Sequence, residues 1–84
     1  MNKGRFPIKI EVTAYSGYRA NERPLHFVLD HSKKDVRRII KRWIEPGKDF
    51  FKVSANDGKE YILCWERDSD TWFLEEINDD YSDV

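Results

Sequence analysis

Apolar residues alternate with polar ones along several short segments of this chain, and this pattern limits the folds open to it. Ile8, Ile10, Val12 and Ala14 alternate with charged or polar residues, which predicts a strand with one buried face. The segments predicted as strands are 8–15, 25–29, 51–55, 61–65 and 72–74. Because the chain has only 84 residues, these strands belong to one small domain with a modest core.

Turn residues separate the predicted strands. Asn56-Asp57-Gly58 predicts a hairpin turn, because Gly tolerates a positive φ and Asp forms local hydrogen bonds. Asp68-Ser69-Asp70 predicts a second turn, and residues 16–24 predict a loop. The last residues are polar and acidic. We therefore expect a domain over 1–77 and a frayed acidic tail over 78–84.

The segment 33–44 fits two structures. Its apolar residues recur at the spacing of one helix face: Val36, Ile39, Ile40, Trp43 and Ile44. Pro46-Gly47 would end such a helix. As a strand, the segment would need a bulge near Arg37–Arg38 to keep Val36 and Ile39 on one face.

Several residue groups follow one another in an order that resembles a known family. They are Ser16-Gly17-Tyr18, Asn21-Glu22-Arg23-Pro24, Phe27, Val36, Ile39, Trp43, Phe50–Val53, Asp57-Gly58, Tyr61–Leu63 and Trp72–Leu74. The family consists of short bacterial proteins labelled only "cytoplasmic protein", and the resemblance covers roughly residues 8–77. It implies a bacterial, cytoplasmic protein and carries no established activity.

The second half is more distantly similar to small β-domains associated with Y-family-polymerase-like proteins of bacterial mutagenesis. Those domains have a Gly-x-x-Tyr-x-Val hairpin, whereas this chain has His31 or Ser32 for the Gly and Lys34 for the Tyr. That departure favours a helix, but the resemblance as a whole implies a bent strand at 33–43. We therefore expect a mainly β fold, a strongly curved antiparallel sheet or SH3-like barrel of five or six strands. The alternative is an α+β domain with one helix at 33–44.

Charge is distributed unevenly along the chain. Residues 1–44 hold 11 Lys or Arg and 4 Asp or Glu, a net +7, whereas residues 45–84 hold 4 and 12, a net −8. The densest basic group is Lys33, Lys34, Arg37, Arg38, Lys41 and Arg42. Cations gathered on one element can neutralise phosphates, so nucleic acid is a candidate partner. The plainer interpretation is a solvated face.

A second candidate site is the loop before the second predicted strand. Tyr18, Arg19, Asn21, Glu22 and Arg23 bring an aromatic ring and both signs of charge into one short stretch. Loops held by a rigid scaffold often carry binding residues. A Glu beside two Arg equally suits an ion-pair latch that fixes the loop to the sheet.

The sequence offers little for catalysis or for a cofactor. His26, His31 and Cys64 lack the spacing of metal ligands, and Cys64 has no adjacent base. Asp68 and Asp70 fit a turn better than a catalytic carboxylate pair. No run of about 18 apolar residues occurs, and one cysteine fits a reducing compartment. We therefore expect a cytoplasmic protein that is not an enzyme and has no cofactor, metal or membrane segment.

Together these features favour a non-catalytic binding module. The basic stretch and the polymerase-associated resemblance favour nucleic acid as its partner. The alternative is a protein-interaction or regulatory module, in which the acidic tail shields the basic face until a partner displaces it. The sequence leaves the oligomeric state and the pathway open.

Overall fold

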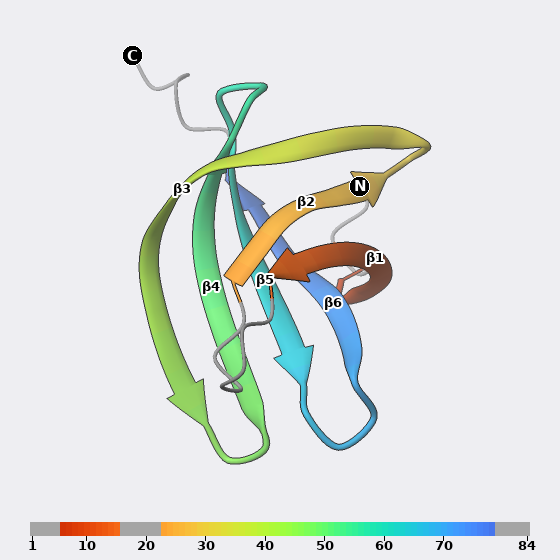
Figure 1. The fold of residues 1–84 in the computed structure, drawn as a ribbon, viewed down its shortest axis with the longest axis vertical. Helices are drawn as coiled ribbons and strands as arrows, with labels where there is room; N and C mark the ends of the chain where they lie inside the picture. The colour runs from red at the N-terminus through yellow and green to blue at the C-terminus, as the bar shows by residue number, and fades with distance from the viewer. Residues whose placement is uncertain (1–5, 16–22, 79–84) are drawn as a thin grey trace.

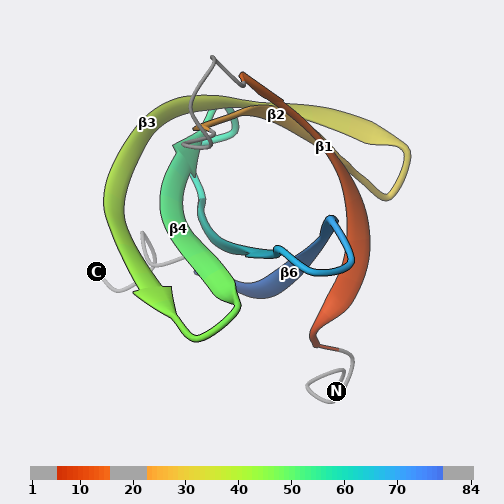
Figure 2. The ribbon, with the colours of Figure 1, turned by 60° about the horizontal axis from the view of Figure 1, so that its bottom comes forward.

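The computed structural model describes residues 6–15 and 23–78, and these form an antiparallel β-barrel. Its strands are β1 (Ile8–Tyr15), β2 (Arg23–Leu29), β3 (Ser32–Glu45), β4 (Lys48–Ala55), β5 (Glu60–Glu66) and β6 (Thr71–Asn78). Each strand pairs with the next along the chain, and β1 also pairs with β6, so the sheet closes on itself (Figures 1 and 2). The predicted small β-barrel is confirmed.

The alternative of a helix at 33–44 is wrong, because this segment lies within β3, the longest strand. Val36 lies opposite Ala55 and Arg38 opposite Ser54, which leaves Arg37 as an extra residue in a bulge. A second register shift between Ile39 and Lys41 makes Ile40 extra as well. The predicted bulge near Arg37–Arg38 is therefore confirmed, and a second bulge follows it.

The two bulges explain why the segment looks helical in sequence. A regular strand returns to the same face every two residues, but each bulge adds one residue to that interval. Across the two bulges the inward positions of β3 are consequently Val36, Ile39 and Arg42, which recur every three residues. This spacing is close to the 3.6-residue period of a helix. The bulges also bend β3 strongly, and Figure 2 shows it curving around the barrel.

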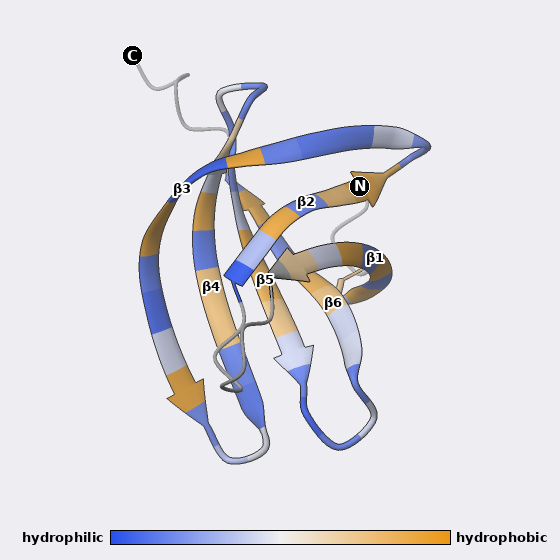
Figure 3. Ribbon diagram, in the orientation of Figure 1, coloured by the Kyte–Doolittle hydropathy of each residue, from blue (hydrophilic) through white to orange (hydrophobic). Residues whose placement is uncertain are grey.

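The core fills the inside of the barrel with large side chains. Figure 3 shows apolar and polar residues alternating along β4, and the apolar ones are buried. The fully or nearly buried apolar residues are Phe27, Phe51, Val53, Ala55, Tyr61, Leu63, Trp65, Trp72 and Leu74. Five of these nine residues are aromatic, so a small barrel gains much buried area from few residues.

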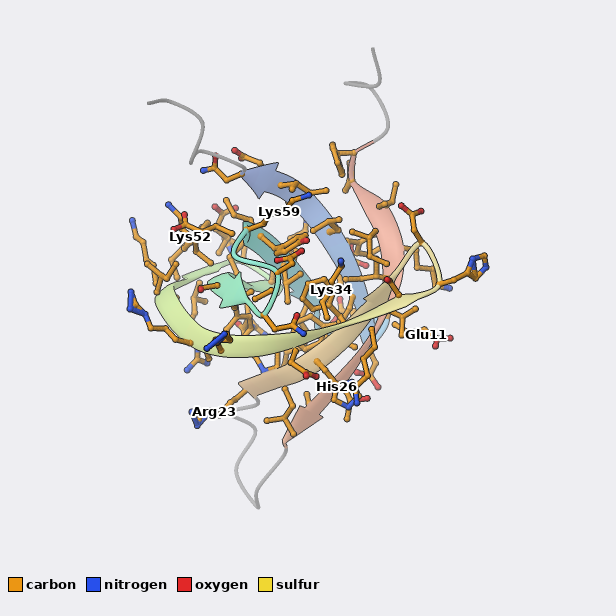
Figure 4. All side chains as sticks on the ribbon, turned by 90° about the horizontal axis from the view of Figure 1, so that it is seen from above. Glu11, Arg23, His26, Lys34, Lys52 and Lys59 are labelled. Carbon is orange, nitrogen blue, oxygen red and sulfur yellow. The ribbon has the colours of Figure 1, made fainter. Side chains whose placement is uncertain are left out.

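Polar side chains close one end of the barrel. Lys34 faces inward from β3 and lies over this end (Figure 4), with its Nζ 3.3 Å from a carboxylate oxygen of Asp57. Asp57 also accepts hydrogen bonds from the Tyr61 hydroxyl and, at 2.9 Å, from the Lys59 backbone N–H. Burial raises the pKa of Asp57, but the hydrogen bonds from Tyr61, Lys59 and Lys34 outweigh it and hold that pKa below its ordinary value of 3.8.

A second polar network closes the opposite end. Asp49 is only 4% exposed, and its carboxylate accepts a hydrogen bond from the Arg67 guanidinium. The Arg42 guanidinium lies 3.7 Å from the same carboxylate. The Arg67 backbone N–H donates to the Gly47 carbonyl at 3.0 Å, which joins the β3–β4 turn to the β5–β6 turn. Asp49 thus has a structural role at this end of the barrel, where it holds two arginines.

The turns are as short as the sequence predicts, and two of them hold residues with positive φ in place of Gly. Asp70, in the predicted 68–70 turn, has φ 53° and accepts a hydrogen bond from the Trp65 indole at 2.9 Å. The β2–β3 hairpin turns on Asp30 and His31, with φ of 53° and 65°. Two positive φ values match the twist of hairpin strands, so this hairpin forms without Gly.

The end of the domain differs slightly from the expected boundary. The sequence analysis places Asn78 in an acidic tail, whereas Asn78 is the last residue of β6 and lies opposite Glu60. Residues 79–84 of the predicted tail lie outside the described residues.

Candidate nucleic-acid interface

The six basic residues of 33–42 do not form one row, because β3 sends them in different directions. Lys34 and Arg42 face inward, where each pairs with a carboxylate at one end of the barrel. Arg42 also lies over the Phe51 ring, with its guanidinium carbon 5.3 Å from the ring centroid. These two residues therefore stabilise the fold and are removed from the candidate site.

The outward cations of β3 line up with a cation of β4. Arg38 lies opposite Ser54 and Lys41 opposite Lys52, all on the outer face because their neighbours Val53 and Ala55 are buried. Within the described parts of the chain, no carboxylate lies within ion-pair distance of Arg38 or Lys41. Their charge is therefore available to an anionic partner.

Two aromatic rings continue this row toward the β3–β4 turn. Trp43 and Phe50 are opposite each other, and their rings stack with centroids 5.2 Å apart and planes inclined by 2°. Both side chains are half-buried, so part of each ring faces solvent. The Lys41 Nζ lies 5.4 Å from the Trp43 ring centroid, which places a cation beside the aromatic pair. We call Arg38, Lys41, Trp43, Phe50 and Lys52 together the β3–β4 outer face.

Acidic residues border this face and set its limits. Along β3 the outward positions beyond it are Asp35 at one end and Glu45 at the other. Next to β4, the outer surfaces of β5 and β6 carry Glu60, Glu66, Glu75 and Glu76. Only one ion pair joins the two sides among the described residues, Lys52 to Glu60 at 3.6 Å. The basic and acidic outer surfaces therefore adjoin along β4.

Three arginines gather around a hollow beside the β3–β4 outer face. The β2–β3 ladder extends only from Leu29 opposite Ser32 to His26 opposite Asp35, so the strands separate beyond that point. The resulting open hollow has a volume of about 180 Å³, and Arg23, Arg37 and Arg38 line it. Its apolar lining consists of Pro24, Leu25, Val36 and Ile39. We call this site the three-arginine hollow.

The hollow unites part of both candidate sites that the sequence predicts. Arg23 comes from the predicted loop site, and Arg37 and Arg38 come from the basic stretch. Figure 4 shows Arg23 at the start of β2, directed away from the barrel. The other predicted loop residues, Tyr18, Arg19, Asn21 and Glu22, lie outside the described residues. Lys33 stands apart from the hollow, near the β2–β3 turn and 4.0 Å from the Asp35 carboxylate.

Cys64 lies on the outer side of β5, between Phe50 and Phe73 of the neighbouring strands. The thiol is nevertheless buried, with 1% of the residue exposed. Burial raises the pKa of Cys64 to about 11, and the nearby Glu75 carboxylate adds to the effect. The thiol is therefore protonated at neutral pH, which agrees with the structural role expected for it.

The described residues provide no other site with clear chemistry. Across residues 6–15 and 23–78, no three His, Cys, Asp or Glu side chains come together as metal ligands would. Nor does this part of the chain contain a helix with the length and hydrophobicity needed to cross a membrane. Asp68 and Asp70 lie in the β5–β6 turn, as predicted.

The basic residues of this face are evident in the sequence, but the surface position of Trp43 is not. Trp43 falls on the apolar stripe of the helix alternative, and that interpretation places it in the core. A strand with two bulges instead puts it on the outer face beside Phe50. The sequence of β4 contains one clue to this outer aromatic pair. Phe50 lies between Asp49 and Phe51, which face inward, so the alternation of a strand places Phe50 on the outer face.

Comparison with known proteins gives no independent assignment. No family model, no curated protein and no solved structure matches this chain. The functional argument consequently depends on the geometry of the site.

Proposed function

We propose that this protein is a non-catalytic module that binds single-stranded nucleic acid on the β3–β4 outer face. One observation carries the proposal: a row of cations leads directly to a stacked pair of half-exposed aromatic rings. The cations suit phosphates and the rings suit bases, which is the combination that single-strand-binding proteins use. Small β-barrels commonly bind single strands in this way.

The size of the face indicates a short binding site. From Arg38 to Trp43, β3 advances by at most five residues at about 3.3 Å each, or about 16 Å. A face of this length accommodates a few nucleotides, at the lower end of the roughly 4–16 nucleotides bound by single oligonucleotide-binding barrels. Duplex nucleic acid is the weaker candidate, because its bases are stacked on each other and do not reach Trp43 or Phe50.

The proposal predicts salt-dependent binding with a shallow slope. Arg38, Lys41 and Lys52 would contact about three phosphates, so log K should fall against log salt with a slope of about −2 for a single strand. Fluorescence anisotropy with labelled oligo-dT and oligo-U of about 12 nucleotides measures this slope. Absence of binding at low salt and micromolar protein would overturn the proposal.

Charge-reversal variants separate the proposed face from the general effect of net charge. Lys41→Glu with Lys52→Glu should weaken oligonucleotide binding by more than about tenfold, because both phosphate contacts become repulsive. Lys33→Glu with Lys59→Glu changes the net charge by the same amount away from the face, and should leave affinity nearly unchanged. Equal losses for the two double variants would show that binding is not located on the β3–β4 outer face.

A further inference from the structure

We infer that the three-arginine hollow binds a phosphate monoester, the dianionic group found at the end of a nucleic-acid strand. The source of this phosphate rests on the proposed function, whereas the phosphate chemistry rests on the hollow alone. Three features of the hollow support the inference: its three arginines, its size and its position at the end of the cationic row.

The three arginines line one hollow because of the strand irregularities. In a regular strand Arg37 and Arg38 would point to opposite faces, but the bulge at Arg37 lets both residues line the same hollow. On the opposite side, the register of β2 shifts between His26 and Pro24, and Arg23 lines the hollow from there. Three arginines from two strands therefore line one space.

None of the three arginines has an ion-pair partner among the described residues. Arg42 and Arg67, in contrast, both pair with Asp49. Three like charges that line one hollow repel each other, and a bound anion would relieve that repulsion. Guanidinium groups also match the geometry of phosphate oxygens, because they donate parallel hydrogen bonds.

The hollow has the size of a single small group. Its volume of about 180 Å³ is close to the roughly 150 Å³ of a cavity that holds one benzene ring. A phosphate with a few waters fits this space. The apolar lining limits the competing hydration of the guanidinium groups on one side.

The position of the hollow favours a terminal phosphate over an internal one. Arg38 is the last cation of the β3–β4 outer face, and the next outward residue of β3 is Asp35. A strand that followed the cations from Trp43 would meet this carboxylate, so its path is expected to end at the hollow. A terminal phosphate carries nearly two negative charges at neutral pH and an internal phosphodiester carries one, so three arginines favour the terminal group.

The first experiment tests the phosphate chemistry without any oligonucleotide. Inorganic phosphate is titrated into the labelled protein while the arginine Nε–H signals are followed by NMR. We expect saturable shifts of the Arg23, Arg37 and Arg38 signals, and their loss in Arg23→Gln with Arg37→Gln. Lys33→Gln with Lys59→Gln removes equal charge elsewhere and should leave the shifts intact. Unshifted arginine signals in the unaltered protein would overturn the inference.

The second experiment tests the source of the phosphate. One oligonucleotide is compared with a 5′-phosphate, with a 3′-phosphate and with neither. One of the two phosphates, but not both, should raise affinity about tenfold, the effect of one charge-assisted hydrogen bond. Arg23→Gln with Arg37→Gln should abolish this gain, and Arg38 is left intact because it also belongs to the β3–β4 outer face.

Two further outcomes separate the inference from the proposed function. Trp43→Ala should weaken binding of the phosphorylated and unphosphorylated oligonucleotides by the same factor, which leaves the phosphate gain unchanged. If inorganic phosphate shifts the arginine signals but no oligonucleotide binds, the phosphate site holds and the nucleic-acid source is overturned. A phosphoserine peptide that binds more tightly than the phosphorylated oligonucleotide overturns that source in the same way.

Discussion

Arg38 and Arg42 lie on the same strand, and the structure gives them opposite roles. Arg42 faces inward, where it contacts the buried Asp49 carboxylate and the Phe51 ring. Arg38 faces outward and meets no carboxylate among the described residues. Side-chain direction along β3 therefore decides which cations stabilise the barrel and which are free to bind a partner.

This difference predicts unequal effects of two identical substitutions. Arg42→Ala should lower the free energy of unfolding by about 1–2 kcal/mol, because Asp49 loses a charge-assisted contact and the Phe51 ring loses the guanidinium that lies over it. Arg38→Ala should change it by less than about 0.5 kcal/mol, as is usual at an exposed position. Urea denaturation of the two variants measures both values, and equal losses would contradict the assigned roles.

The buried thiol of Cys64 predicts a specific pH dependence. Its pKa is about 11 in the folded protein, against an ordinary value of 9.0. The thiol of the unfolded chain therefore ionises first, and this group's contribution to stability is lost as the pH rises from about 9 to about 11. Cys64→Ala should lose less stability than the unaltered protein across that interval. The thiolate absorbance of the folded protein can be followed as the pH is raised. A rise near pH 9 would contradict the raised pKa of Cys64.

At the scale of single elements, β3 shows what could and could not be predicted from sequence. Most of the other strands keep a period of two over the stretch that the sequence predicts, so their alternation was sufficient to predict them. In β3 the two bulges convert that period into three, so the inward Val36 and Ile39 have the spacing of a helix face, and the outward Trp43 happens to extend that spacing. Local pattern alone cannot separate the two structures, because the pairing with β4 that fixes the bulges is a tertiary property.

The candidate site was predictable to a similar, partial extent. The basic residues are visible in sequence, but their division between inside and outside depends on the bulges. The meeting of Arg23 with Arg37 depends on how β2 and β3 separate, which no local signal records. The pairing of Trp43 with Phe50 likewise requires the register of the β3–β4 hairpin.

The β2–β3 hairpin offers a test of its turn geometry. His31 has φ 65°, a left-handed conformation that costs a residue with a side chain more than it costs Gly. His31→Gly should therefore raise the free energy of unfolding by about 0.5–1 kcal/mol, measured by urea denaturation. His31→Ala keeps a Cβ and should give no gain. An equal gain for both variants would show that the imidazole, not the backbone, is responsible.

At the scale of the whole molecule, the opposite charges of the two halves of the chain come to lie on different outer surfaces. The net charge of −1 gives no indication of this arrangement. β3 and β4 present Arg38, Lys41 and Lys52, whereas β5 and β6 present mainly glutamates. The acidic surface beside the basic face repels an anionic partner and so orients that partner on β3 and β4.

The three tryptophans of the chain provide a direct test of nucleic-acid binding on this face. Trp65 and Trp72 are buried inside the barrel, at 8% and 7% exposed, whereas Trp43 lies on the outer face. When a single-stranded oligonucleotide is titrated into labelled protein, the Trp43 indole N–H signal should shift, together with the backbone amides of Lys41 and Lys52. The indole signals of Trp65 and Trp72 should stay in place. An unmoved Trp43 signal, or shifts confined to β5 and β6, would contradict the account.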